Sequence, residues 1–139
     1  MTGGGEITRE ARPESLAALL GFLDGAIAGA ALDAATASDV RLAAEEVCTN
    51  VIAHAYPDGR RGTVTLRFRR AAGAVVVTLE DTGIPFDPGL APVPRLGDGW
   101  EQRALGGLGW HLVRRVMDEV RHEPLPGGGN RVTLIKRSR

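Results

Sequence analysis

A glutamate, an asparagine and a histidine stand four residues apart in the segment EEVCTNVIAHAY, residues 45–56. In a helix, steps of four residues advance the side chain by only about 40°, so Glu46, Asn50 and His54 form one row beside an apolar face. The Asn50 amide oxygen can bind Mg²⁺ alongside phosphate oxygens and waters, and Glu46, one turn away, can orient or deprotonate an attacking hydroxyl. The alternative is a helix whose polar residues only border its core face, with His54 interacting with the helix dipole.

A second polar group appears where an apolar run ends at a carboxylate, in the segment LEDTGIPFDP, residues 79–88. Asp81 would lie at the end of a strand, with Gly83 two residues later. A carboxylate can accept a hydrogen bond from an exocyclic amine such as that of adenine, and a glycine lets a flat ring approach the backbone. Because Asp, Gly and Pro are also the usual residues of turns, an ordinary turn is the alternative.

The third group is the segment GGLG, residues 106–109, at the start of a predicted helix. Unpaired backbone N–H groups and the helix dipole favour an anion such as phosphate at that point. Lysine is scarce, since Lys136 is the only one among 17 basic residues, and the G-x-x-x-x-G-K-[ST] phosphate loop is absent. A glycine hinge is the alternative. Each motif is weak by itself, and specificity comes from the three in this order.

Hydrophobic periodicity predicts the elements that must hold these residues. The clearest is a helix with apolar residues recurring from Val40 to Ala55 and an N-cap at Ser38 or Thr36. Residues 81–109 are rich in Gly and Pro and lack a period, which is typical of a functional or mobile loop. In chain order, the predicted elements are an edge strand at 6–11, a helix at 14–32, the capped helix to 55, strands at 62–70 and 74–79, the loop, a helix at 108–120, and strands at 119–123 and 131–136.

This order predicts an α+β fold, a two-layer sandwich with the strands in one sheet and the helices on one face. A length of 139 residues fits one domain, 1–139. Seventeen basic residues balance seventeen acidic ones, so no net field favours nucleic acid or an acidic membrane. The chain has a single cysteine, Cys48, and its N-terminus lacks the apolar run of a signal peptide. No apolar stretch approaches the roughly 20 residues of a membrane-spanning helix. These features predict a soluble cytoplasmic protein.

The three motifs together resemble a known set of ATP-binding motifs. E-x-x-x-N-x-x-x-H-A-Y, then D-x-G-x-P-F-D-P, then G-G-L-G before a helix, resembles the boxes of the GHKL superfamily, which includes gyrase, Hsp90, histidine kinases and MutL. With the segment MDEV at 117–120, the chain most resembles the bacterial anti-sigma-factor serine kinases, over about residues 6–137. The resemblance implies a Bergerat-type fold, with a mixed, mostly antiparallel sheet covered by helices on one face and an ATP lid at about 82–109.

The resemblance also implies roles for individual residues. Asn50 would be the Mg²⁺ ligand, Glu46 the base for a protein hydroxyl, Asp81 the partner of adenine and Gly83 the glycine that faces the ring. The residues that would bind ATP phosphates from the lid are Gly106, Gly107, Leu108 and Gly109.

Three further positions complete the implied ATP site. Family members often carry a glycine and a threonine in the last box, whereas this chain has Gly129 and Asn130, and Asn130 can hydrogen-bond adenine or a bridging water. Arg103 and His54 are candidates for stabilising phosphate charge, and a solvated loop residue is the alternative for Arg103.

By resemblance, the expected function is a kinase of a partner-switching system. ATP and Mg²⁺ would bind under the lid, and the γ-phosphoryl group would pass to a Ser or Thr of a STAS-domain antagonist. The protein would otherwise hold a sigma factor or another target, and it could form a homodimer through the N-terminal strand and first helix.

The main alternative is an ATP-gated regulator that sequesters its partner without transferring phosphate. Glu46 favours the kinase, because nucleotide sensing alone has less need of a base. The catalytic domain of a histidine kinase is disfavoured because no dimerisation helix with a phosphoacceptor His precedes it, and a gyrase-type ATPase would add transducer domains.

Overall fold

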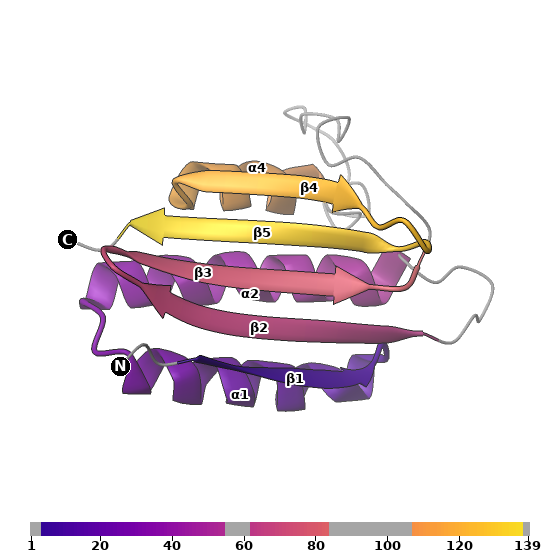
Figure 1. Cartoon of the computed structure of the whole chain (residues 1–139), viewed down its shortest axis with the longest axis horizontal. Coiled ribbons are helices and arrows are strands. Elements are labelled where there is room, and N and C mark those ends of the chain that lie inside the picture. The colour runs from indigo at the N-terminus through magenta and orange to yellow at the C-terminus, as the bar shows by residue number, and fades with distance from the viewer. Residues whose placement is uncertain (1–3, 55–61, 84–106, 138–139) are drawn as a thin grey trace.

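The computed structural model describes residues 4–54, 62–83 and 107–137 (Figure 1). The elements follow the predicted order. They are β1 (Gly4–Glu10), a 3₁₀ turn (Pro13–Ser15), α1 (Leu16–Gly29), α2 (Ala34–His54), β2 (Thr63–Ala71), β3 (Ala74–Asp81), α4 (Gly107–Val116), β4 (Glu119–Pro124) and β5 (Asn130–Arg137).

The strands form one sheet in the order β1-β2-β3-β5-β4, and α1, α2 and α4 cover one face of it (Figure 1). The predicted α+β two-layer sandwich is therefore confirmed. All four strand pairings are antiparallel, whereas a partly mixed sheet was expected. The difference arises because β4 runs in the same direction as β3 but goes to the edge, and β5 returns between them through the β4–β5 hairpin.

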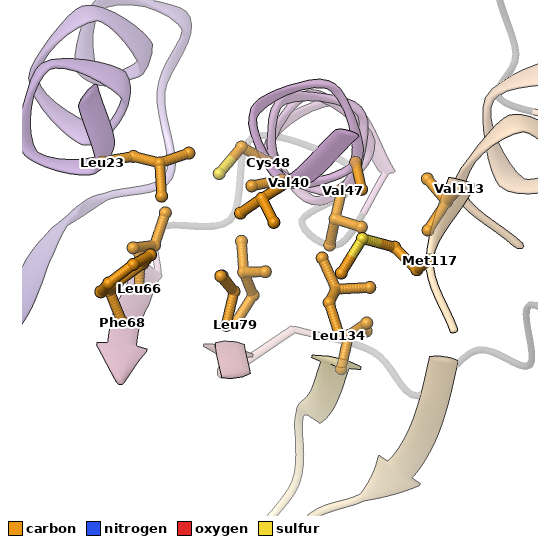
Figure 2. Packing of buried hydrophobic residues seen from close by; sticks show 14 of the residues in the cluster. Leu23, Val40, Val47, Cys48, Leu66, Phe68, Leu79, Val113, Met117 and Leu134 are labelled. Carbon is orange, nitrogen blue, oxygen red and sulfur yellow. The ribbon is translucent and has the colours of Figure 1, made fainter. Parts of the chain in front are cut away.

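Alternating side chains of the sheet build the core against the helices. In β2 and β3 every second residue is buried, and that alternation continues at the start of β5. Figure 2 shows Leu66 of β2 facing Leu23 of α1, and Leu134 of β5 facing Val47 of α2. Because the period of a strand is two residues, Asp81 and Asn130 are the next core-facing positions at the ends of their strands.

The single cysteine belongs to this core. Cys48 is fully buried on α2, and its burial raises the pKa of the thiol to about 12. The thiolate is therefore strongly disfavoured, and Cys48 is a packing residue. Among the helices that the structure describes, none has the length and apolar character needed to cross a membrane.

The N-terminal cap of α2 differs from the prediction. The Asp33 carbonyl accepts the first helical hydrogen bond from Ala37 N at 2.9 Å, and its carboxylate accepts bonds from Thr36 N at 3.1 Å and Thr36 Oγ1 at 2.5 Å. These bonds from Thr36 lower the pKa of Asp33. Asp33 is thus the cap, and the prediction of Ser38 or Thr36 was wrong because the helix starts earlier, at two alanines that favour helix.

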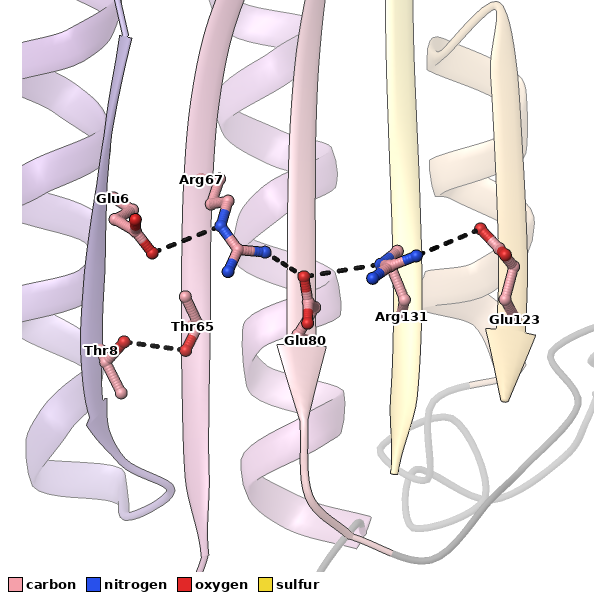
Figure 3. Close-up of polar contacts among 7 residues, drawn as sticks. All are labelled: Glu6, Thr8, Thr65, Arg67, Glu80, Glu123 and Arg131. Carbon is pink, nitrogen blue, oxygen red and sulfur yellow. Dashed lines mark hydrogen bonds and ion pairs between the residues drawn. The ribbon is translucent and has the colours of Figure 1, made fainter. Parts of the chain in front are cut away.

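The other face of the sheet carries a row of charges (Figure 3). Arg67 of β2 pairs with Glu6 of β1 and with Glu80 of β3, and Arg131 of β5 pairs with Glu80 and with Glu123 of β4. This charge ladder links all five strands. It lies one residue along β3 and β5 from Asp81 and Asn130, on the opposite face.

Candidate functional site

The carboxyl group of Asp81 lies at the end of β3 and is only 2% exposed. Its Oδ1 accepts hydrogen bonds from Gly83 N at 2.9 Å and from Asn130 Nδ2 at 3.1 Å. Its Oδ2 is buried and has no hydrogen-bond partner among the described residues. Because an unpaired buried acceptor is costly, Oδ2 fits a ligand that supplies an N–H donor.

Burial also raises the pKa of Asp81, because the carboxylate loses its solvation on the core side of the sheet. The hydrogen bonds from Asn130 and Gly83 and the nearby imidazole of His122 act in the opposite direction. A ligand amine at Oδ2 would add another donor and favour the charged carboxylate further.

The glycine before Asn130 brings the two strand ends together. Gly129 has φ +100, and a Cβ at this position would lie 2.0 Å from the Asp81 carbonyl oxygen. Only glycine fits such an approach. It places Asn130, which is 0% exposed, opposite Asp81 in the β3–β5 register.

One residue of this group was missed by the sequence analysis. His122 of β4 places Nε2 2.8 Å from Asn130 Oδ1. The alternation of β4 would have put His122 on the same face as Val120, but its contact with Asn130 depends on the β4–β5 register. That register follows from the turn geometry at 125–129, which the sequence did not fix.

The row predicted on α2 is only partly described. Glu46 and Asn50 are both partly buried, and His54 is the last residue of the helix. Burial raises the pKa of Glu46, and the charge of Glu45 adds to that shift.

Glu45, the residue before Glu46, makes a structural contact. Its Oε2 pairs with Arg41 Nη1 at 2.6 Å, one turn earlier on α2. Arg41 Nε also donates to Asp24 Oδ1 of α1 at 2.6 Å. Glu45 is therefore engaged in the contact between α1 and α2, whereas no ion pair is found for Glu46 among the described residues.

Lys136 shows how α2 and α4 are oriented over the sheet. Near the end of β5, its Nζ donates to the carbonyl of Val116, the last residue of α4, at 2.6 Å and pairs with Asp39 of α2 at 3.0 Å. The start of α2 and the end of α4 therefore lie at the end of β5. The opposite end of the molecule holds the C-terminal end of α2, the end of β3, the start of β5 and the start of α4 (Figure 1).

The predicted phosphate-binding segment starts α4. Gly107, Leu108 and Gly109 form the first residues of this helix, at the same end of the molecule as Asp81. Gly106 and Arg103 lie outside the described residues, as does most of the predicted lid at about 82–109. The only lysine is engaged at the other end of α4, so it is not part of this segment.

The described side chains suit a metal ion that is coordinated mainly by the phosphate oxygens of a nucleotide and by waters. Among residues 4–54, 62–83 and 107–137, no group of three His, Cys, Asp or Glu could hold a metal ion. Asn50 offers a single amide oxygen, which suits Mg²⁺ when phosphate oxygens and waters complete its coordination.

Comparison with known proteins agrees with this geometry. A family model described as histidine kinase-like ATPase domain matches residues 9–136. The chain therefore belongs to the histidine kinase-like ATPase domain family. Its sequence is RsbW-like, which confirms the predicted resemblance to the serine kinases of the GHKL superfamily.

Several relatives carry this resemblance. Serine-protein kinase RsbW of Bacillus licheniformis is 31% identical over 121 residues, 84% of this chain and 75% of the relative. RsbW of Bacillus subtilis (strain 168) is 35% identical over 88 residues, 60% of this chain and 54% of the relative, so this match spans about half of that protein. Serine/threonine-protein kinase BtrW of Bordetella bronchiseptica is 29% identical over 97 residues, 70% of this chain and 68% of the relative.

A solved structure has the same fold. The crystal structure of the RsbU and RsbW domains of a Mycobacterium tuberculosis protein aligns with a TM-score of 0.69 and 19% sequence identity. The alignment covers 97% of this chain and 32% of that longer chain. At this identity, the likeness supports the fold alone.

Proposed function

We propose that the chain is an ATP-dependent protein serine/threonine kinase of a partner-switching system. The observation that carries the proposal is the buried Oδ2 of Asp81, which has no partner among the described residues and lies where α2, β3, β5 and α4 meet. The similarity of the chain's sequence to proteins named serine-protein kinase and serine/threonine-protein kinase supports the reaction type.

In this proposal, the adenine amine donates to Asp81 Oδ2, and Gly83 leaves room for the flat ring. The backbone N–H groups at Gly107, Leu108 and Gly109 start α4, and their helix dipole favours the phosphates. Asn50 would supply one oxygen to Mg²⁺, and bound Mg²⁺ would neutralise phosphate charge. Gly106, Arg103 and His54 remain candidates for further phosphate contacts.

Glu46 would act as the base. Burial and the neighbouring Glu45 raise the pKa of Glu46, which strengthens its carboxylate as a proton acceptor. It would accept the proton of the substrate hydroxyl as that oxygen forms its bond to the γ-phosphorus and the bond to ADP breaks. Glu45 cannot take this role while it pairs with Arg41.

The proposed substrate is a serine or threonine of a STAS-domain antagonist, and the regulated target is a sigma factor or another protein held in its place. The protein would act in the cytoplasm. We expect no direct contact with nucleic acid or with a membrane surface, because the charges of the chain balance.

A homodimer through β1 and α1 is part of the proposal. β1 is an edge strand, and an apolar groove of about 480 Å³ lies between β1 and α1, lined by glycines of both elements together with Phe22 and Phe68. A second copy could cover this groove and the open strand edge. Sedimentation as a monomer across the micromolar range would contradict the dimer.

The experiment that tests the kinase combines the protein with labelled ATP, Mg²⁺ and the STAS-domain protein encoded nearby. We expect phosphate on a serine or threonine of the STAS protein, and we expect Asn50→Ala to weaken the Mg²⁺-dependent binding of ATP. Thr49→Ala is the control, because Thr49 is the exposed neighbour on the same turn of α2. ATP binding without any transfer would instead support a sequestering regulator.

A further inference from the structure

Three side chains form a hydrogen-bonded relay across the end of the sheet. His122 Nε2 lies 2.8 Å from Asn130 Oδ1, and Asn130 Nδ2 lies 3.1 Å from Asp81 Oδ1. The residues come from β4, β5 and β3 respectively. Asn130 and Asp81 are buried and His122 is partly buried, so the relay extends from the partly exposed edge strand to the carboxyl group in the core.

The chemistry of the groups fixes the direction of this relay. An ionised carboxylate only accepts hydrogen bonds, so Asn130 must turn its NH₂ group toward Asp81. The Asn130 oxygen then faces His122, and His122 Nε2 must carry a hydrogen to donate to it. His122 therefore donates to Asn130, and Asn130 donates to Asp81 Oδ1. Gly83 N donates to the same Asp81 oxygen.

The backbone leaves the rotation of the Asn130 amide open, and both Asp81 and His122 contact that amide. The β3–β5 register and the close approach of Gly129 fix the Cα positions of Asp81 and Asn130. They do not decide which end of the Asn130 amide faces the carboxylate. His122 pairs with Val132 in the register, diagonal to Asn130, and its N–H favours the same amide orientation as the Asp81 carboxylate does.

We propose that His122 is a positioning residue for nucleobase selection. Through Asn130 it directs donors to Asp81 Oδ1 and leaves Oδ2 as a pure acceptor, which selects a purine with an amine at position six over one with an oxo group there. The inference rests on the proposed binding of ATP and names what sets its base preference.

Loss of the His122 donor would weaken the preference for a purine with an amine at position six, because Asp81 would be protonated more readily. Without this donor, one of the contacts that hold the Asn130 amide in this orientation is lost, and its NH₂ group is held less firmly toward the carboxyl. A buried carboxyl with fewer donors takes up a proton more readily. A protonated Asp81 can donate to an oxo group, so a 6-oxo purine would no longer be rejected.

The test measures the dissociation constants of ATP and of inosine triphosphate, in which an oxo group replaces the amine. We expect the unaltered protein to prefer ATP and His122→Leu to reduce that preference by about tenfold, the effect of one hydrogen bond that fixes a buried group. His122→Gln should keep the preference within about twofold, because its amide can donate from nearly the position of Nε2.

Two further variants separate positioning from simple stabilisation. His122→Asn keeps a polar amide but is too short to reach Asn130, so it should lose selectivity as His122→Leu does, even if the leucine variant fails to fold. Arg121→Leu is the control, because Arg121 is exposed on the same strand and donates to Glu119. Unfolding midpoints without nucleotide are measured for each variant.

The outcomes separate this inference from the proposed function. A preference for ATP that falls in His122→Leu and His122→Asn and returns in His122→Gln supports the role of His122. A preference that stays unchanged in the leucine and asparagine variants overturns this role alone. If the unaltered protein binds neither nucleotide, the proposed function fails and the inference fails with it.

Discussion

The two oxygens of one carboxyl group do different work in this protein. Asp81 Oδ1 is held by Gly83 N and Asn130 Nδ2, while Oδ2 is buried without a partner among the described residues. Such an arrangement costs stability in the free protein, since burial opposes the charge. We infer that the protein keeps this costly arrangement because it binds a ligand, whose amine would donate a hydrogen bond to Oδ2.

Asp81→Asn is expected to stabilise the free protein at neutral pH. Because the folded pKa of Asp81 is raised above its ordinary 3.8, the unfolded chain loses the proton first as pH rises. The native protein should therefore lose stability relative to Asp81→Asn from about that ordinary value up through the raised folded pKa. Beyond it, the difference should be constant.

Urea unfolding at a series of pH values measures this difference. Asp118→Asn is the control, since Asp118 is an exposed carboxylate at the opposite end of the sheet. The same Asp81→Asn protein should bind ATP more weakly, because an amide at this position can present a donor toward the adenine amine. Lower stability of Asp81→Asn at every pH would contradict this account of the site.

The charge of Glu45 provides a pH test of the proposed base. Glu45→Gln removes a like charge, so the pKa of Glu46 should move down, while burial keeps it above the ordinary value. The acid limb of the pH–rate profile for phosphoryl transfer should then move to lower pH. Single-turnover rates across pH measure it, and an acid limb that stays in place in Glu45→Gln would exclude Glu46 as the titrating base.

Some of the site could be predicted from single residues and some could not. Glu46, Asn50, Asp81 and Gly83 stand in motifs with a fixed local spacing, which a sequence displays directly. The role of His122 depends on which residue of β5 lies diagonal to it, a relation set by pairing between strands.

At the scale of elements, the two ends of α4 have separate tasks. Its first residues are the glycine segment, at the same end of the molecule as Asp81, and the carbonyl of its last residue accepts a hydrogen bond from Lys136, whose side chain is 19% exposed. A lysine at the C-terminal end of a helix interacts favourably with the helix dipole. Lys136 thereby joins α4, α2 and β5 away from the proposed ATP site.

Lys136→Met should lower the free energy of unfolding by about 1 kcal/mol, through loss of a partly buried hydrogen bond and an ion pair. Methionine keeps an apolar stem of similar length, so packing is largely retained. Urea unfolding measures the change, and Arg137→Met on the exposed neighbour is the control. Equal effects of the two substitutions would contradict the proposed anchoring role.

The order of elements followed from periodicity, but two boundaries did not. The predicted helix at 108–120 ends at Val116, because Asp118 N already donates to Ile135 O at 2.9 Å in the pairing of β4 with β5. The cap of α2 moved to Asp33 for a local reason, its bonds with Thr36. Tertiary pairing thus overrode the helical pattern at one boundary, and cap geometry decided the other.

At the scale of the whole molecule, the two faces of the sheet differ in kind. The covered face holds the core and the relay, and the open face holds the charge ladder of Glu6, Arg67, Glu80, Arg131 and Glu123. Exposed ion pairs contribute little individually. A ladder of opposite charges across neighbouring strands does favour the register that puts Asp81 and Asn130 inside.

Glu80→Gln tests that view, because Glu80 is the central link of the charge ladder. We expect a loss of stability of less than about 1 kcal/mol that shrinks as salt is added, since screening weakens the pairs in the unaltered protein. The preference for ATP should not change. A salt-independent loss of several times this size would show that Glu80 acts by other means.

The fold class could be predicted because strands and helices alternate in an order that leaves few arrangements. The sheet direction was less predictable, since the position of β5 between β3 and β4 is a long-range choice made by packing. The site lies where these choices converge, at the end of the molecule that collects α2, β3, β5 and α4.

The central claim is that this ATP site drives phosphoryl transfer to a protein hydroxyl with Glu46 as base. The most direct measurement is the single-turnover transfer of labelled phosphate from saturating ATP to the STAS-domain protein by the unaltered protein and by Glu46→Gln, with ATP binding measured on the same samples. We predict that Glu46→Gln binds ATP like the unaltered protein and transfers phosphate at least about a hundredfold more slowly, the usual contribution of a positioned base. Equal transfer rates in the two proteins would contradict the account.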